Sequence, residues 1–433
     1  MLRHRFLTAR SSLDVAIVGC GFAGAAAAAL LARDAHHVTV YERVPEPGAV
    51  GAGILLQPTG LAVLAELGLL DRVRERGAEV AALRARTHAG RELFHLRYER
   101  LARGLFGIGL HRGALFEALV GALRKAGARL CPGIEVASID ARSTRPRLLA
   151  ADGRAFAEHD LVLVCDGARS RLRTDSGIAH RARAYPWGAL WFVGEDAENR
   201  FAGTLSQVCD GTQQMLGFLP TGLGAAGGKT PLVSLFWSIR IDRMDDWGAQ
   251  GLDAWKQAVL RYEPRADALL AQIRDRDQML VATYQDVVMS RLHRGRIAYL
   301  GDAAHATSPQ LGQGANLALL DAAAIAAALR GEAEIDRALS RYARSRHAHA
   351  RFYGLASRWL TPFFQSDLRW LAAIRDVGFP LLARMRLAEA QMLRTLAGVK
   401  RGMLRRSQPV EPLRLSLTRR KQADLSRPTR GEA

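Results

Sequence analysis

Residues 13–24 read LDVAIVGCGFAG, an apolar, β-branched run followed at once by three closely spaced glycines. The run from Leu13 to Val18 is typical of a buried parallel strand. The alanine-rich stretch 25–33 that follows favours a helix. A second apolar run, residues 37–41, predicts another strand and ends at Glu42. The segment therefore predicts a strand, a glycine turn, a helix and a second strand, the opening unit of an α/β fold.

The three glycines form a G-x-G-x-x-G pattern, and an acid follows 23 residues after the first of them. In this pattern Gly19 permits the tight turn, Gly21 lets the backbone approach a pyrophosphate, and Gly24 allows close packing of helix and strand. The helix N-terminus offers free N–H groups to the phosphates. Glu42 would accept hydrogen bonds from a ribose hydroxyl. The pattern predicts a dinucleotide site and leaves NAD and FAD open; a glycine turn used only for packing is the alternative.

The same region resembles a targeting segment, because residues 15–32 carry no charge and follow Arg3, Arg5 and Arg10. Eighteen apolar residues approach the length of a membrane span or a signal peptide. The glycines in its interior weaken a continuous hydrophobic helix. A strand, turn and helix are therefore favoured, and we expect a cytoplasmic protein, with association at a membrane surface left open.

Composition indicates a globular protein of two or three domains: 433 residues, 49% hydrophobic and 24% charged. Lys and Arg number 61 against 42 Asp and Glu, a formal net charge of +19. Nucleic acid, an anionic membrane or a phosphate-bearing ligand would each suit this charge, and compositional bias of the source is the neutral alternative. The four cysteines are widely spaced and indicate neither a metal site nor a disulfide framework.

Four further segments carry recognisable patterns. One is a glycine-containing run leading into a helix, one is a helix start with an arginine, and two are apolar strands ending in Asp-Gly or Gly-Asp turns. In chain order they are residues 51–58 (GAGILLQP), 110–119 (LHRGALFEAL), 161–173 (LVLVCDGARSRLR) and 297–316 (IAYLGDAAHATSPQLGQGAN).

Together these motifs resemble the flavoprotein aromatic hydroxylases of the p-hydroxybenzoate hydroxylase fold. Residues 51–58 are most similar to salicylate-hydroxylase-type members. The resemblance covers about residues 13–175 and 285–325. It implies a Rossmann-like FAD-binding domain with an inserted, mostly-β substrate domain and C-terminal helices. It also implies FAD as cofactor, NAD(P)H as co-substrate, and hydroxylation of an aromatic ring with O₂ through a C4a-hydroperoxyflavin.

The resemblance also implies roles for individual residues. Glu42 should hold the adenosine ribose, Arg112 the adenosine and pyrophosphate region, and Asp302 the ribityl and pyrophosphate region. Pro309 should lie beside the isoalloxazine, with the N–H groups of residues 312–316 facing the reduced flavin. Pro309 and His305 form the candidate catalytic set, although a structural histidine is the commoner case. The cofactor-binding set is Gly19, Gly21, Gly24, Glu42, Arg43, Gly53, Arg112, Asp166, Gly167, Gly301, Asp302, Gly312, Gly314, Ala315 and Asn316.

The middle of the chain has strand-like runs at residues 189–193, 214–220 and 231–239. The resemblance makes this region an open sheet with one face over the flavin. The candidate wall residues for an aromatic substrate are Gln57, Met215, Phe218, Phe236 and Trp237. Packing in the core is the alternative for each of them.

The expected domains are residues 1–182 and 287–345 for FAD, 183–286 for substrate, and 346–433 for C-terminal helices and a basic tail. Residues 352–398 loosely resemble ubiquinone-ring hydroxylases, which would suit a bulky or lipophilic substrate. Residues 400–433 hold ten Lys or Arg and three Asp or Glu, a net of +7. This tail is expected to be solvated, with peripheral membrane contact as the alternative. It has no aromatic residue to stack on bases, so no nucleic-acid partner is expected.

The sequence predicts an FAD-dependent NAD(P)H monooxygenase acting on a small aromatic substrate with O₂ and no metal. Two rivals share the cofactor fold. A flavin-dependent halogenase usually carries W-x-W-x-I-P, which residues 236–239 (FWSI) do not supply. An isoprenoid reductase would transfer hydride without O₂. A non-catalytic flavoprotein bound to membrane or nucleic acid is a third alternative.

Overall fold

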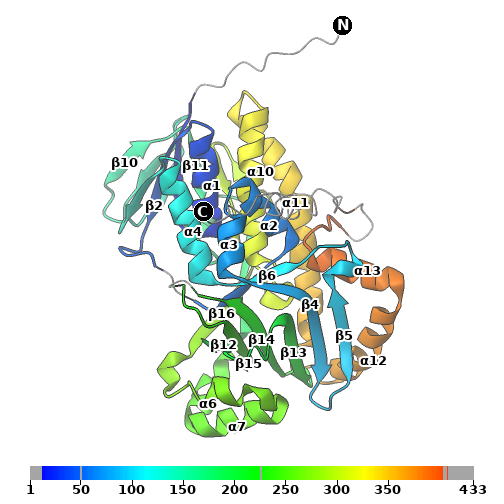
Figure 1. The fold of residues 1–433 in the computed structure, drawn as a ribbon. Helices are drawn as coiled ribbons and strands as arrows, with labels where there is room; N and C mark the ends of the chain where they lie inside the picture. Colours follow the sequence, from blue (N-terminus) through cyan, green and yellow to red (C-terminus); the bar gives the residue numbers. More distant parts are fainter. Residues whose placement is uncertain (1–11, 49–50, 225–226, 403–406, 408–433) are drawn as a thin grey trace, which may run out of the picture.

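Two large β-sheets and a set of C-terminal helices make up the chain in the computed structural model (Figure 1), which describes residues 12–48, 51–224, 227–402 and 407. The six-stranded sheet is parallel except at one edge, where β17 is antiparallel to β18. Its strands, in spatial order, are β17 (His293–Arg294), β18 (Ile297–Tyr299), β11 (Leu161–Val164), β1 (Asp14–Val18), β2 (His37–Glu42) and β7 (Arg129–Pro132). The predicted strand, turn, helix and strand at residues 13–42 are confirmed.

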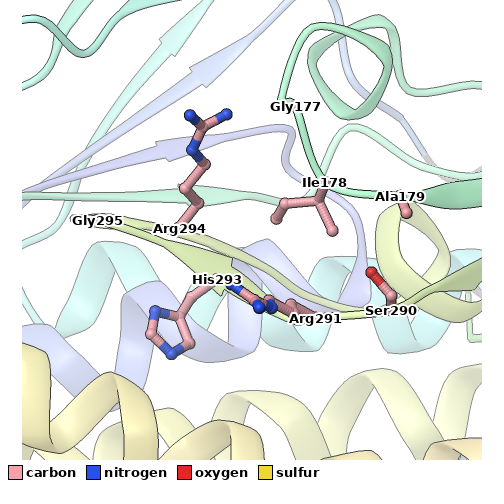
Figure 2. A pocket seen from close by; sticks show the side chains of 8 residues that line it. All are labelled: Gly177, Ile178, Ala179, Ser290, Arg291, His293, Arg294 and Gly295. Carbon is pink, nitrogen blue, oxygen red and sulfur yellow. The ribbon is translucent and has the colours of Figure 1, made fainter.

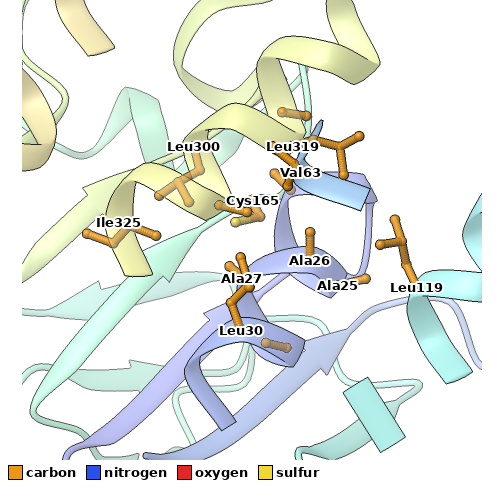
Figure 3. Close-up of a cluster of buried hydrophobic side chains, with 14 of the residues drawn as sticks. Ala25, Ala26, Ala27, Leu30, Val63, Leu119, Cys165, Leu300, Leu319 and Ile325 are labelled. Atoms are coloured by element: carbon orange, nitrogen blue, oxygen red, sulfur yellow. The ribbon is translucent and has the colours of Figure 1, made fainter. Parts of the chain in front are cut away.

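Helix α1 (Phe22–Arg33) is buried along most of its length, and residues 25–29 are all alanine with no exposed surface. Small side chains let this helix lie close to its neighbours, so dispersion contacts are dense. It packs against α4 (Arg112–Lys125) and α10 (Gly314–Gly331). Figure 3 shows Ala26 and Ala27 of α1 in one cluster with Leu119 of α4 and Leu319 of α10. The apolar stretch 15–32 is therefore core, as β1 and α1.

The larger sheet has nine strands. Eight follow one path: β16 (Leu280–Met289), β12 (His180–Glu195), β15 (Leu232–Arg240), β14 (Gln214–Gly222), β13 (Gly203–Asp210), β4 (Ala78–Thr87), β6 (Gly107–His111) and β3 (Gly53–Leu56). The ninth, β5 (Glu92–Arg97), pairs with β4. The strands expected in the middle of the chain are present as β12, β14 and β15. The sheet also takes four strands, β3 to β6, from before residue 183. A small third sheet holds β8 (Ser138–Asp140), β9 (Arg147–Leu149) and β10 (Ala155–Glu158).

Helices cover both faces of the larger sheet. On one face lie α6 (Met244–Gln250), α7 (Leu252–Tyr262) and α8 (Asp267–Leu270), which the strand-like pattern of this region did not indicate. On the other face, α12 (Trp370–Arg384) lies beside β5 (Figure 1), and α13 (Arg386–Leu396) follows it. The remaining helices are α2 (Pro58–Glu66), α3 (Leu70–Arg76), α5 (Arg171–Thr174), α9 (Asp302–His305) and α11 (Ile335–Leu360).

The predicted fold class is confirmed: a dinucleotide-type parallel sheet, a mostly-β second unit and C-terminal helices. Among the described residues, α10 is the one helix long and apolar enough to cross a membrane by length and composition. More than half of it is buried, as in the core helix of a folded domain. Residues 403–406 and 408–433, which hold most of the basic tail, lie outside the described residues.

Candidate functional site

The carboxyl ends of four adjacent parallel strands converge at one edge of the six-stranded sheet. In spatial order β18, β11, β1 and β2 lead into Gly301–Asp302, Asp166–Gly167, Gly19 and Glu42. These residues come from three distant parts of the chain. In open α/β sheets this edge is where ligands bind. The fold therefore brings together the main cofactor candidates of the sequence.

The three glycines of the first motif differ in what surrounds them. A Cβ on Gly19 would lie 2.5 Å from the carbonyl oxygen of Cys165, and Gly19 has φ +98°. A Cβ on Gly24 would lie 2.0 Å from the carbonyl oxygen of Gly19. A Cβ on Gly21 would meet nothing within 4 Å. Gly19 and Gly24 are thus required by the protein's own packing, whereas the space beside Gly21, at the start of α1, is open for a ligand.

Two charged side chains flank this glycine loop. The carboxylate of Glu42 accepts hydrogen bonds from the backbone N–H groups of Cys20 at 2.7 Å and Val44 at 2.9 Å, which ties the end of β2 to the loop. The guanidinium of Arg112 lies 5.0 Å from the ring centroid of Phe22, in the first turn of α1. A cation is thus held beside the N-terminus of α1, where pyrophosphate would gather. Arg43, next to Glu42, is exposed.

Asp166 follows β11 and carries an unusual carboxyl group. Its Oδ1 is buried and has no hydrogen-bond partner among the described residues. Burial raises the pKa of the Asp166 carboxyl, and the hydroxyl of Ser170 and the charge of Arg173 offset this only partly. Arg173 is itself buried and donates to the carbonyl oxygens of Ala168 at 2.9 Å and Ala303 at 2.9 Å. Arg173 thus links the Asp-Gly turn to the Gly-Asp helix, a long-range contact that has no local signature in the sequence.

Asp166→Asn is expected to stabilise the cofactor-free protein by about 1 kcal/mol, because an amide is cheaper to bury than a carboxylate with one unpartnered oxygen. The same change should weaken FAD binding about tenfold if Oδ1 accepts a hydrogen bond from the cofactor. Thermal unfolding of the cofactor-free protein and flavin titration measure the two effects separately. Asp175→Asn, at an exposed site nearby, is the control.

The sign of the pH dependence follows from the raised pKa. The folded state keeps its proton to higher pH than the unfolded state, so Asp166 lowers stability as pH rises from about 4 through its folded pKa. The stability that Asp166→Asn gains over the wild type should therefore be largest at neutral pH and vanish toward pH 4. An advantage that grew on acidification would contradict this account.

His305 lies in a buried ionic network rather than in an open site. Its Nε2 is 2.6 Å from Oδ2 of Asp321, which also accepts the backbone N–H of Gly301 at 2.8 Å. Oδ1 of Asp321 accepts from Nε of Arg346 at 2.6 Å. These contacts hold the pKa of Asp321 well below its usual range despite complete burial. The geometry favours the structural role for His305 over acid–base catalysis.

The network fixes the position of the Gly-Asp motif. Gly301 has φ +59°, and a Cβ there would lie 3.0 Å from Cβ of Ala23 in α1. Asp302, the next residue, is exposed, and a Cβ on Gly314 would lie 4.0 Å from its Oδ1. Asp302 therefore faces the start of α10. Asp321, which organises this region, was not singled out from the sequence, although a lone carboxylate in an alanine-rich helix was a usable signal.

Asn316 and Gln57 join the start of α10 to the junction of β3 and α2. Oδ1 of Asn316 accepts from the backbone N–H of Gln57 at 2.8 Å, and its Nδ2 donates to the carbonyl oxygen of Gly312 at 3.0 Å. The side chain of Gln57 accepts from the hydroxyl of Tyr98 at 2.5 Å. Its Nε2 is buried and lacks a partner within the described part of the chain. A Cβ on Gly312 would lie 4.0 Å from that Nε2, so Gln57 presents an unused donor toward the loop before α10.

Hydrogen bonds between hydroxyl groups fix the position of the segment around Pro309. The Oγ of Ser308 lies 2.7 Å from Oγ of Ser357 and 2.7 Å from Oγ1 of Thr361. Gln310 donates from Nε2 to Oε1 of Gln365 at 2.8 Å. These bonds fasten the Pro309 segment to the end of α11 and to the residues that follow it.

The four apolar wall candidates of the larger sheet divide between its two faces. Phe218 and Trp237 pack with α7 and α8, on the face away from the C-terminal helices. Met215 and Phe236 lie on the opposite face, in one cluster with Phe364. Since neighbouring residues of a strand point to opposite faces, one wall cannot hold both Phe236 and Trp237. Phe218 and Trp237 are core residues. Met215 and Phe236 are also buried, and they are the two that remain candidates for a substrate wall because they share the other face of the sheet.

Gly53 lies where β3 approaches β14 and β15. A Cβ there would lie 2.5 Å from Oγ of Ser234 and 2.9 Å from Oγ1 of Thr221, so the strand needs a glycine at this position. Gly53 is therefore explained by packing within the protein.

A cavity of about 750 Å³ lies elsewhere, beside the edge strand β17. Figure 2 shows its lining, which includes Arg291, His293 and Arg294 and none of the motif residues. It is therefore separate from the site at the carboxyl ends of the strands. The described residues contain no group of three or more His, Cys, Asp or Glu side chains able to hold a metal ion.

The residues at the sheet edge fit FAD. The open space beside Gly21, the unpartnered Oδ1 of Asp166 and the cation of Arg112 together suit a ligand with a pyrophosphate and hydroxyl groups. The unpartnered Nε2 of Gln57 and the N–H groups at the start of α10 would donate hydrogen bonds to an electron-rich ring system bound beside them.

Comparison with known proteins agrees with this fit. The model of the FAD binding domain family matches residues 12–353. A probable 2-heptyl-3-hydroxy-4(1H)-quinolone synthase of Rhodococcus erythropolis is 31% identical over 344 residues, 76% of this chain and 82% of that protein. A 3-amino-4-hydroxybenzoate 2-monooxygenase of Streptomyces cremeus is 30% identical over 326 residues, 71% of this chain and 76% of that protein.

Solved structures agree on the fold. HpxO of Klebsiella pneumoniae, solved with FAD and uric acid, superposes with a TM-score of 0.75 at 23% identity, covering 89% of this chain and 97% of that one. With the family match over most of its length, the chain belongs to the FAD binding domain family and, within it, to the FAD-dependent aromatic monooxygenases.

Proposed function

We propose that this protein uses NAD(P)H and O₂ to hydroxylate a lipophilic, nitrogen-containing aromatic ring of the 4-quinolone class. The observation that carries the proposal is an apolar sheet face beside the Pro309 segment. Met215 and Phe236 of this face share a cluster with Phe364, and Phe364 follows Thr361, which is hydrogen-bonded to Ser308. From this series of contacts we infer that the wall candidates lie near the expected flavin position.

The shape of this face suits a flat apolar ring. A Cβ on Gly217 would lie 2.0 Å from Cζ of Phe236, so the Phe236 ring lies across a strand position that must be glycine. The ring centroid of Trp191 is 5.0 Å from that of Phe236. The two rings are tilted by 39° relative to each other, and an aromatic pair of this kind favours contact with a further aromatic ring.

The choice of a quinolone rests on the relatives. Quinolone synthases of Rhodococcus erythropolis and Mycobacteroides abscessus are 31% and 30% identical to this chain. Their product is an alkylated bicyclic ring bearing a new hydroxyl group. An apolar wall with few polar groups is better matched to that chemistry than to a small carboxylate.

FAD held by the glycine loop at Gly21, Arg112 and Asp166 would supply the redox chemistry that couples NAD(P)H and O₂ to hydroxylation of the ring. In balance, substrate C–H, O₂, NAD(P)H and H⁺ give substrate C–OH, H₂O and NAD(P)⁺. The protein's part is to hold the ring at the Pro309 segment and exclude water. The N–H groups at residues 312–316 and Nε2 of Gln57 would stabilise negative charge on the ring system. The hydroxyl of Tyr185 on β12 is buried beside Ser308, the residue before Pro309, and we assign it a contact with the substrate.

The assay that tests the proposal is oxygen uptake by the flavin-loaded protein with NADH or NADPH. A panel of 2-alkyl-4-quinolones should accelerate NAD(P)H oxidation and yield hydroxylated products, and hydroxybenzoates should do so less. If no aromatic compound in the panel raised oxidation above the substrate-free rate, the proposed activity would be wrong.

Phe236→Leu is expected to raise KM for the aromatic substrate about tenfold, because it removes one aromatic surface of the wall. Phe218→Leu is the matched control on the other face of the sheet. It should lower stability by roughly 1 kcal/mol and leave KM unchanged. Steady-state kinetics and thermal unfolding of both variants separate the two roles. Equal KM values in the two variants would remove Phe236 from the substrate wall.

We also propose that the basic tail, residues 400–433, contacts an anionic membrane surface. Its net charge of +7 is the feature that supports the contact. Flotation with anionic vesicles, with residues 419–421 changed to glutamine, tests it.

A further inference from the structure

Helix α12 carries a row of large apolar side chains on its outer face. Trp370, Ile374, Val377 and Leu381 recur at the spacing of one helix face and are 59%, 51%, 60% and 62% exposed. Met385 continues the row at the end of the helix and is also exposed. An ordinary surface scatters such residues singly, so a continuous row indicates an interaction surface.

The opposite face of α12 is firmly packed, so the row is not a loosely docked core face. Arg375 is fully buried and donates from Nη1 to the carbonyl oxygens of Gly211 at 2.7 Å and Phe363 at 2.9 Å. The ring of Phe379 lies 5.6 Å from that of Phe363 and 5.8 Å from that of Phe364. These contacts fix which side of the helix faces outward.

Arginines stand at both ends of the apolar row. Arg369 precedes it, and Arg384 and Arg386 follow it; all three are exposed. No ion pair to any of the three is present among the described residues. By contrast, Arg100 is paired with Glu389 of α13 at 2.8 Å. An apolar row between unpaired cations matches the layering of an anionic bilayer, with acyl chains beneath phosphates.

We propose that the outer face of α12 docks on an anionic lipid surface, with the apolar row entering the interface and the three arginines on lipid phosphates. Charge favours an anionic lipid surface over two other possible occupants of this face of α12. A second copy would bring the same arginines together, and the chain's own tail is cationic with a net of +7. The proposal does not depend on the substrate. Docking would nevertheless place the lipid surface next to Phe363 and Phe364, behind the wall that carries Phe236.

The experiment is vesicle flotation of the full, flavin-loaded chain with phosphatidylcholine alone and with phosphatidylglycerol added. Binding is expected only with phosphatidylglycerol. Val377→Ser/Leu381→Ser should weaken it by about tenfold or more, since apolar burial is lost. Arg384→Gln/Arg386→Gln should weaken it by about fivefold for each arginine. Brominated lipid should quench the tryptophan fluorescence, and Trp370→Phe should remove most of that quenching while binding persists.

Matched controls lie on the far part of the larger sheet and its helices. Leu280→Ser/Val281→Ser changes two exposed apolar residues, and Arg261→Gln/Arg274→Gln two exposed arginines. Neither should alter binding. The proposal is overturned if only the glutamine variant of residues 419–421 loses binding. It is equally overturned if Val377→Ser/Leu381→Ser abolishes self-association in sedimentation without lipid, which would make a second copy the occupant.

Discussion

Asp321→Asn is expected to lower the free energy of unfolding by about 3 kcal/mol and to weaken FAD binding at the same time. The carboxylate of Asp321 accepts from Gly301, His305 and Arg346, and it is completely buried. An amide has one acceptor oxygen and one donor group, so it must turn its NH₂ toward at least one of these donors. The buried charge of Arg346 would then lack its counter-ion.

The effect on FAD follows from the position of Gly301. Its N–H is held by Asp321, and Asp302 at the cofactor edge is the next residue. Denaturant unfolding and flavin titration measure the two consequences. Asp336→Asn, an exposed aspartate on α11, should behave as wild type. The double variant Asp321→Asn/Arg346→Met should recover part of the lost stability, because no buried charge is then left alone.

The pH dependence of this effect has a definite sign. The folded-state pKa of Asp321 lies well below the unfolded value, so its stabilisation is present above about pH 4 and is lost as pH falls through the folded pKa. The difference between wild type and Asp321→Asn should therefore be constant from pH 5 to 8. A difference that disappeared near neutral pH would contradict the assigned role.

Gly24→Ala and Gly21→Ala are expected to fail in different ways although both add one methyl group. The methyl at position 24 would lie 2.0 Å from the carbonyl oxygen of Gly19, so α1 must move away from β1. We expect a loss of at least roughly 3 kcal/mol of stability even without cofactor. The methyl at position 21 meets no protein atom within 4 Å, so the cofactor-free protein should lose no more than about 1 kcal/mol.

FAD binding should separate the two variants further. The space beside Gly21 is where the pyrophosphate approaches the backbone, so Gly21→Ala should weaken FAD about a hundredfold, close to 3 kcal/mol. Flavin retention during purification and titration of the cofactor-free protein are the measurements. Normal flavin content in a stable Gly21→Ala protein would show that the cofactor lies elsewhere.

The sequence was sufficient wherever function depends on local chain geometry. Strand, glycine turn and helix at residues 13–33 are adjacent in the chain, and Asp166 and Asp302 each lie within a few residues of the end of an apolar strand. Parallel strands present their carboxyl ends at one edge, so these motifs converge without any long-range information. The separation of Phe236 from Trp237 was also foreseeable, because adjacent strand residues face opposite sides.

Long-range partners were not foreseeable from one sequence. The contact of Asp321 with Arg346 joins two helices, and that of Tyr98 with Gln57 joins residues 41 positions apart. Neither has a local signature, since each depends on how whole elements pack. The strands β3 to β6 join the larger sheet through one such contact, because β4 pairs with β13, which lies far along the chain.

The central claim, FAD-dependent hydroxylation of an aromatic ring, is tested most directly by turnover under ¹⁸O₂. The purified protein should be yellow, and with NAD(P)H and a 2-alkyl-4-quinolone it should form a product with one ¹⁸O atom on the ring. Gly21→Ala, lacking flavin, should form none. Product that carried oxygen from water, or turnover that continued without O₂, would contradict the claim.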